Sequence, residues 1–315
     1  MKTMKDLVVA NFNCTFGKDD RPMLDYFDKI IYPALNGDIK RKPSENDYYF
    51  FDEVKVIEYQ KDEFVLVGLL IKSTKLEVKS IYKEGKGLIR INEKYNSDPY
   101  SIFLIFLKNH RMVLVRNQKG SPDIRSFGAT INYVINEYIK EINRNRQKEN
   151  KLPYANVHVV SIPSQQTIIE QLQEVKQINT LIMKFYPLNG DMPVGRLFNS
   201  LRDQIDFMGS KTGNFVANTP KNRSYVAQLI SETGGTVEPT VKVTLPNGDK
   251  KVLKSDSFTE KIDVEISEDE DFEYNIYEIL TRIKERKEIK ESSENHKVIY
   301  LENLNKIKKV RDDFK

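Results

Sequence analysis

The stretch Phe64-Val65-Leu66-Val67-Gly68-Leu69-Leu70-Ile71 decides the fold class of this chain of 315 residues. Successive side chains of a β-strand point to opposite faces of the sheet, and here both alternating sets are apolar. Such a strand is buried on both faces, so it belongs inside a sheet rather than at an exposed edge. A second apolar run, Ser101–Leu107, predicts another buried strand nearby.

The residues on either side of this stretch extend it into a β meander between Tyr48 and Arg116. Turn-like polar residues follow Gln60 and Leu107 and predict hairpins at those points. The expected strands are Tyr48–Gln60, Phe64–Thr74, Leu76–Lys83, Ser101–Leu107 and Met112–Val115. A short strand over Leu7–Phe16 precedes the meander, and a long amphipathic helix over Phe127–Glu149 follows it.

The best candidate for a domain boundary is Lys151-Leu152-Pro153, because the proline ends the helix and the composition changes there. In the second half, Asn247-Gly248 predicts a tight hairpin. With Phe258–Ile266 as a third strand, this hairpin gives a three-stranded meander. We therefore predict an α+β fold of mostly antiparallel sheets with packed helices, in two domains followed by a charged tail. Their bounds are 1–151, 154–290 and 291–315.

The composition limits the function classes. With 39% hydrophobic and 30% charged residues, the chain is neither disordered nor of low complexity. It has one cysteine, three histidines, no run of about 18 apolar residues and no signal-peptide core, so we expect a cytoplasmic protein. Phosphate-loop, dinucleotide, nucleophile-elbow and zinc-protease motifs are missing from the sequence. We expect no metal, cofactor or catalytic residue, and leave open whether the chain is an enzyme.

Positive charge is concentrated in parts of the chain. Residues 176–254 hold 11 Lys and Arg against 6 Asp and Glu, whereas residues 255–315 hold 12 against 17. Basic residues beside amides and hydroxyls suit a phosphate backbone, and sequence-independent affinity follows from such contacts. Lys40-Arg41-Lys42 is a further small cluster. The residues we predict to contact nucleic acid are Arg196, Arg202, Lys211, Lys221, Arg223, Arg144, Arg146, Lys148 and Lys151.

Two other functions compete with DNA binding. Glu53-Val54-Lys55 and Glu77-Val78-Lys79 each place an acid and a lysine on one face of a strand, as in a Mg²⁺-dependent nuclease, with Asp47 or Asp52 as a second carboxylate. For the acidic stretch Asp263–Glu273 we weigh a divalent-ion site and nucleic-acid mimicry, and we favour the simpler interpretation that acids at a helix start are expected from the helix dipole alone. The third possibility is a protein–protein adaptor without nucleic-acid contact.

The order of elements resembles a known family. The run Pro99–Leu107, a tight turn, Met112–Arg116, and Asp123-Ile124-Arg125-Ser126-Phe127 leading into a helix are similar to the middle of the Rex exclusion protein A family of temperate phages. The strand, helix and Asn247-Gly248 hairpin pattern downstream is similar as well. The resemblance implies an antiviral defence or phage-exclusion protein acting in abortive infection. It also implies non-specific binding of double-stranded DNA, a homodimer and a membrane-protein effector as partner.

Overall fold

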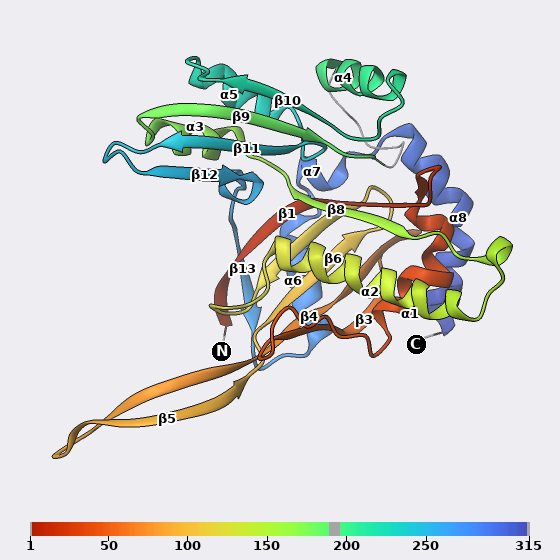
Figure 1. Cartoon of the computed structure of the whole chain (residues 1–315). Coiled ribbons are helices and arrows are strands. Elements are labelled where there is room, and N and C mark those ends of the chain that lie inside the picture. The colour runs from red at the N-terminus through yellow and green to blue at the C-terminus, as the bar shows by residue number, and fades with distance from the viewer. Residues whose placement is uncertain (1, 189–195, 314–315) are drawn as a thin grey trace.

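The computed structural model describes residues 2–188 and 196–313 and contains two antiparallel sheets with helices packed against them (Figure 1). The predicted α+β fold class is confirmed. In these two described ranges, no helix is both long enough and apolar enough to cross a bilayer.

The larger sheet contains the apolar stretch 64–71 in strand β4. Its order is β13-β1-β7-β6-β4-β3, with β2 and β8 paired to β1 and β5 paired to β4. Phe64 and Leu66 pack into the core on one face, while Val65 and Val67 pack into the core on the other. The prediction of a strand buried on both faces is confirmed. The strands are β1 (Lys2–Phe16), β2 (Arg21–Pro22), β3 (Tyr48–Gln60), β4 (Glu63–Lys83), β5 (Gly87–Ser97), β6 (Tyr100–Phe106), β7 (Arg111–Arg116), β8 (Ala155–Ser161) and β13 (Ile262–Ser267).

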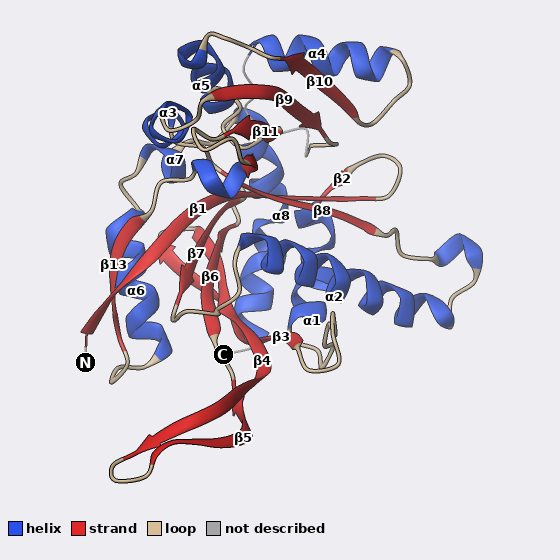
Figure 2. Cartoon of the chain, turned by 60° about the vertical axis from the view of Figure 1, so that its left-hand side comes forward, coloured by secondary structure: helices blue, strands red, loops and turns tan. Residues whose placement is uncertain are grey.

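Helices cover both faces of the larger sheet (Figure 2). One face carries a 3₁₀ turn (Met23–Tyr26), a π turn (Phe27–Ile31), α1 (Tyr32–Leu35), α2 (Ile124–Arg144) and α8 (Glu294–Asp313). The other face carries α6 (Phe272–Ile283) and α7 (Lys287–Lys290). The helix predicted after the meander is α2. It begins where the Asp123 carboxylate accepts a hydrogen bond from the Ser126 N–H at 2.8 Å, which is the usual role of an N-cap aspartate.

The segment 291–315, expected as a charged tail, is largely the packed helix α8. This helix buries Tyr300, Ile307 and Val310 against the larger sheet. The Tyr300 hydroxyl donates to the Asp62 carbonyl at 2.8 Å. Spacings of seven and three residues place these side chains on one helix face. The apolar stripe is narrow, and the many charged residues around it obscure it in the sequence.

The smaller sheet forms the upper part of Figure 1, with strand order β10-β9-β11-β12. Its strands are β9 (Gln177–Phe185), β10 (Gly213–Asn218), β11 (Glu238–Thr244) and β12 (Lys250–Lys254). Helices α3 (Gln165–Gln173), α4 (Arg196–Phe207) and α5 (Arg223–Ser231) pack against it around a third core. The predicted hairpin at Asn247-Gly248 joins β11 to β12.

The third strand predicted for this smaller sheet, Phe258–Ile266, is instead β13 of the larger sheet. Residues 255–258 form a 3₁₀ turn with Phe258 buried, and β13 then pairs with the first half of β1. Strand β8, which follows the proposed boundary at Pro153, pairs with the second half of β1. The smaller sheet is therefore an insertion between two strands that share one edge of β1. Alternation alone predicts a strand but does not say which sheet it joins.

Buried polar groups form the junction between the two sheets. The Asn11 amide donates to the Gly234 carbonyl at 2.6 Å, and the Asn13 amide donates to the Pro187 carbonyl at 2.8 Å. The Tyr186 hydroxyl donates to the Gly235 carbonyl at 2.9 Å. Asn11, Asn13 and Tyr186 are all completely buried. Because buried polar groups are costly without partners, the two asparagine hydrogen bonds fix the insertion onto β1, and the Tyr186 bond joins two segments within the insertion.

Candidate nucleic-acid interface

Arg202 was predicted to contact nucleic acid, but its side chain is part of the fold. Its guanidinium donates to the carbonyls of Tyr186 at 2.7 Å and Thr236 at 2.8 Å, and lies 5.6 Å from the centre of the Phe185 ring. Burial lowers the pKa of this guanidinium. These internal contacts weigh against the prediction for Arg202, because an arginine that satisfies internal carbonyls has fewer donors to offer phosphates.

Arg223 also has internal partners. One of its nitrogens donates to the carbonyls of Val175 at 2.8 Å and Lys176 at 2.9 Å, so it joins α5 to the end of α3. Lys211 is exposed, but it forms an ion pair with Asp20 at 2.5 Å. Lys221 is exposed, and the side chain of Arg196 lies outside the described part of the chain. The stretch 196–223 is thus not a continuous basic track.

The cluster at the end of α2 is accessible. Its members are Arg144, Arg146, Lys148 and Lys151, and all four are exposed. The Arg146 guanidinium donates to the Asn150 carbonyl at 3.2 Å. In the cluster at 40–42, Lys40 lies 5.0 Å from the Phe50 ring centre and Arg41 donates to Thr130 at 3.0 Å. Among the basic clusters predicted from the sequence, as far as the structure describes them, the α2 cluster therefore presents several exposed basic side chains together.

A basic surface missed in the sequence is the two-stranded extension of β4 and β5, residues 73–97, which we call the arm. Both views show it leaving the larger sheet and standing clear of the body (Figures 1 and 2). It carries six Lys and Arg against three Glu. Strand β5 was not predicted, because its apolar and charged residues do not alternate regularly. The signal in the sequence was Gly85-Lys86-Gly87, because closely spaced glycines are typical of a tight turn. In the structure both glycines have positive φ.

The register of the arm separates its two faces. Lys75, Glu77, Lys79, Ile81 and Lys83 alternate along β4 on one face, where Lys94 lies directly opposite Glu77 and Ile89 lies opposite Ile81. We call this the lysine face. All four of its lysines are exposed, and one glutamate accompanies them. Because a lysine ammonium is a compact point charge on a flexible stem, this face suits phosphate groups spaced along a backbone.

The opposite face of the arm carries large apolar side chains, and we call it the apolar face. Leu76 lies opposite Tyr95 near the base, and Tyr82 lies opposite Leu88 near the tip. Their exposed fractions are 59%, 50%, 73% and 72%, respectively. Several large apolar side chains exposed on a single face mark an interaction surface more often than single scattered ones do.

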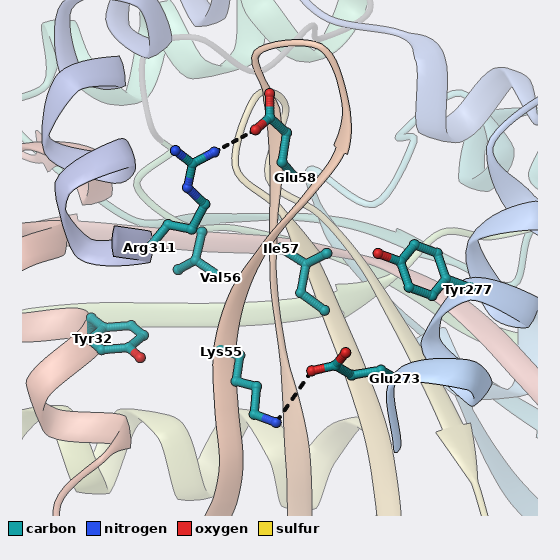
Figure 3. A pocket seen from close by; sticks show the side chains of 8 residues that line it. All are labelled: Tyr32, Lys55, Val56, Ile57, Glu58, Glu273, Tyr277 and Arg311. Atoms are coloured by element: carbon teal, nitrogen blue, oxygen red, sulfur yellow. Dashed lines mark hydrogen bonds and ion pairs between the residues drawn. The ribbon is translucent and has the colours of Figure 1, made fainter. Parts of the chain in front are cut away.

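A charged groove lies between β3, α6 and α8 (Figure 3). It has a volume of 470 Å³. Lys55 forms ion pairs in it with Glu53 at 3.0 Å and Glu273 at 3.6 Å, and Arg311 pairs with Glu58. Glu53, and then Glu273, raise the pKa of the Lys55 ammonium. Each cation in the groove has a carboxylate partner, so the groove joins three elements electrostatically.

The two acid–lysine pairs expected of a nuclease lie apart. Glu53 sits in a β-bulge of β3 at φ 51°, opposite Gly68 of β4, and Glu77 lies on the arm about 30 Å further along that strand. The Asp47 carboxylate accepts a hydrogen bond from the Thr74 hydroxyl and lies 3.6 Å from the Lys72 ammonium. These two contacts lower the pKa of the Asp47 carboxyl. In the acidic stretch, Asp271 caps α6 by accepting from the Tyr274 N–H. Among the described residues, no group of histidine, cysteine and acidic side chains is suited to holding a metal.

The chain matches no family model, no curated protein and no solved structure. The function therefore has to follow from the residues and geometry described above. Within residues 2–188 and 196–313, these features reduce to an accessible basic ribbon, an accessible basic cluster at the end of α2, and a groove whose charges are paired.

Proposed function

We propose that this protein binds duplex DNA without strict sequence preference through the lysine face of its arm. The observation that carries the proposal is a two-stranded ribbon that leaves the body with four exposed lysines on one face. A two-stranded ribbon is narrow enough to enter the major groove of B-DNA. Lysines on it neutralise phosphates without reading bases, so affinity is independent of sequence and falls steeply with salt.

The biological setting of the proposal comes from the Rex-type resemblance. It supports a dimeric sensor in phage exclusion, acting in the cytoplasm through abortive infection and signalling to a membrane-protein effector. The nuclease alternative has less support, since the carboxylates that it requires are separated and engaged by neighbouring side chains.

The test compares two variants that lose equal charge. The first replaces Lys75, Lys79, Lys83 and Lys94 by Gln on the lysine face. The second replaces Arg144, Arg146, Lys148 and Lys151 by Gln at the end of α2. Binding of a fluorescent duplex of arbitrary sequence is titrated by anisotropy at about 50 mM and about 200 mM salt.

The arm variant should lose at least about 100-fold in affinity at the lower salt, and its salt dependence should flatten by about three to four counterions. The α2 variant should stay within about threefold of the wild type, because it changes net charge without removing the contact surface. Equal losses in both variants would overturn the arm as the binding element. Wild-type protein that fails to bind at low salt would overturn the function itself.

A further inference from the structure

The apolar face of the arm needs a partner. A two-stranded ribbon is at best marginally stable in water, and this one exposes two apolar cross-strand pairs, one at its base and one near its tip. In both views the arm projects away from the sheets (Figures 1 and 2). A partner that covers this face therefore comes from outside the folded body.

The order of residues along the apolar face indicates which partner fits. From base to tip the cross-strand pairs are Leu76 with Tyr95, Val78 with Glu93, Ser80 with Arg90, and Tyr82 with Leu88. The face therefore reads apolar, acidic, basic, apolar. Read from tip to base, the same order has its two charges exchanged. A surface with this pattern is complementary to a second copy of itself that runs in the opposite direction.

A β-bulge creates this pattern. Arg90 and Glu93 are three residues apart in β5, so in a regular strand their side chains would point to opposite faces. The structure pairs Ser80 with Arg90 and Val78 with Glu93, so Ile91 and Asn92 together oppose Lys79. Asn92 has φ 49°. The extra residue brings both charges onto the apolar face, about 7 Å apart along the ribbon.

We propose that two copies of this chain form a twofold-symmetric dimer by packing the apolar faces of their arms in antiparallel orientation. Arg90 of each copy then meets Glu93 of the other, and the Leu76–Tyr95 pair of each meets the Tyr82–Leu88 pair of the other. A twofold interface requires this kind of self-complementary patch. The lysine faces of both arms point outward, away from the contact.

The amount of apolar surface fits a weak, reversible dimer. Four large side chains, each at least half exposed, would cover on the order of 400 Å² per copy. The total of about 800 Å² for two copies is below the roughly 1,200 Å² of stable specific interfaces, so the dimer is weak and charge complementarity has a large share in selecting the partner. The inference deepens the proposed function, because it rests on the dimer named there and assigns the contact surface, but its test uses no DNA.

The experiment reverses the two charges separately and then mixes the variants. Arg90→Glu makes both twofold-related contacts acid against acid, and Glu93→Arg makes both base against base. The dimer dissociation constant is measured by sedimentation equilibrium of the full-length chain without DNA. Each single variant should dimerise at least about tenfold more weakly than the wild type.

An equimolar mixture of Arg90→Glu and Glu93→Arg chains should associate again, with an affinity within about threefold of the wild type. In that heterodimer both contacts pair an acid with a base. Lys86→Glu in the turn at the tip is the matched control, since it makes the same charge reversal on the arm and should leave dimerisation unchanged. Circular dichroism and thermal unfolding verify that each variant is folded.

Three results would overturn the inference. They are wild-type protein that stays monomeric up to about 100 μM, single variants that dimerise like the wild type, and a mixture that does not recover. A monomeric wild type whose Tyr82→Ser and Leu88→Ser variants lose DNA affinity would assign the face to DNA instead. Loss of DNA binding with dimerisation intact would overturn only the proposed function, so the two failures are distinguishable.

Discussion

The arm and the junction between the two sheets depart from the usual distribution of side chains in opposite directions. The arm leaves Tyr82 and Leu88 about three-quarters exposed. The junction buries Asn11, Asn13 and Arg111, of which the two asparagines are inaccessible to solvent. Exposed apolar patches and buried polar groups are both informative, because hydrophobic burial alone explains neither.

The difference lies in where the partner is. Asn11 and Asn13 of the junction reach across to the inserted sheet unit, and the Tyr186 hydroxyl bonds within that unit, so the folded chain itself supplies every one of these partners. The apolar face of the arm has no comparable partner among the described residues, since its four large side chains remain at least half exposed. The junction should therefore determine the stability of the chain, and the arm should determine its associations. Substitutions in the two regions test this division.

The largest expected effect is in the junction, where Asn11→Leu should lower the free energy of unfolding by about 3–5 kcal/mol. The Asn11 side chain accepts from the Arg111 guanidinium and donates to the Gly234 carbonyl, and leucine satisfies neither group. Arg111, whose pKa is already lowered by burial, would be left as a buried charge without this acceptor. Urea unfolding measures the change.

The converse substitution in the arm, Leu88→Asn, is the control for Asn11→Leu. It makes an exposed apolar residue polar and should change stability by less than about 0.5 kcal/mol in the monomer. If the two substitutions destabilise the chain equally, the distinction between the two regions is lost.

The second expected effect is a pH dependence that arises at the same junction. His158 of β8 stacks on Tyr186 with ring centres 4.3 Å apart, and burial, followed by the charge of Lys184, lowers its pKa from 6.5 to about 4. The unfolded chain binds this proton at a higher pH than the native chain does. Stability from His158 is therefore fully present above pH 6.5 and is lost as the pH falls toward 4.

The loss should amount to about 2–3 kcal/mol over that interval. His158→Phe keeps a ring against Tyr186 and should remove this part of the pH dependence. Urea unfolding of both proteins at several pH values measures the difference between their stability curves. Parallel curves for the two proteins would show that His158 is protonated equally in the native and unfolded states.

Much of the large sheet could be predicted from local sequence, but its connection to the insertion could not. The stretch 64–71 is apolar at both alternating sets, and that pattern has one interpretation. Asn247-Gly248 likewise encodes a hairpin through local turn chemistry. Strands β8 and β13 carry no sign that both pair with β1, because pairing between strands this far apart in the sequence depends on tertiary packing.

The candidate site was harder to predict for the same reason. Arg202 and Arg223 stand among polar residues in the sequence and are typical of a basic surface. Their carbonyl partners at Tyr186, Thr236 and Val175 are defined only by the folded chain. In the arm, the bulge at Asn92 changes which residues share a face, so a strict two-residue alternation gives the wrong grouping.

A smaller expected effect is the difference in stability cost between alanine substitutions at two glycines with nearly the same backbone conformation. Gly235 at the junction has φ 78°, and a Cβ there would lie 2.8 Å from the Asn11 amide nitrogen and 3.2 Å from the Val160 carbonyl. Gly85 at the tip of the arm has φ 76°, and no heavy atom lies within 4 Å of its added Cβ. Gly235→Ala should cost about 2–3 kcal/mol, and Gly85→Ala about 1 kcal/mol. Chemical denaturation should resolve this difference, and equal costs would mean that Asn11 and Val160 yield without penalty.

The smallest expected effect is that of removing most of the arm. Replacing residues 76–95 by Asn-Gly would join Lys75 to Asn96, which already lie opposite each other, through a two-residue turn. None of the three described cores contains a residue between 73 and 97. The unfolding free energy of the monomer should therefore change by less than about 0.5 kcal/mol.

The shortened chain should at the same time lose dimerisation in sedimentation and lose DNA affinity in the anisotropy titration. Retained stability with both associations lost would separate the two regions most sharply, because one deletion would then remove every proposed contact without weakening the fold. A loss of more than about 2 kcal/mol would mean that the arm packs on the body, and the apolar face would then be part of the core instead of a surface for a second copy.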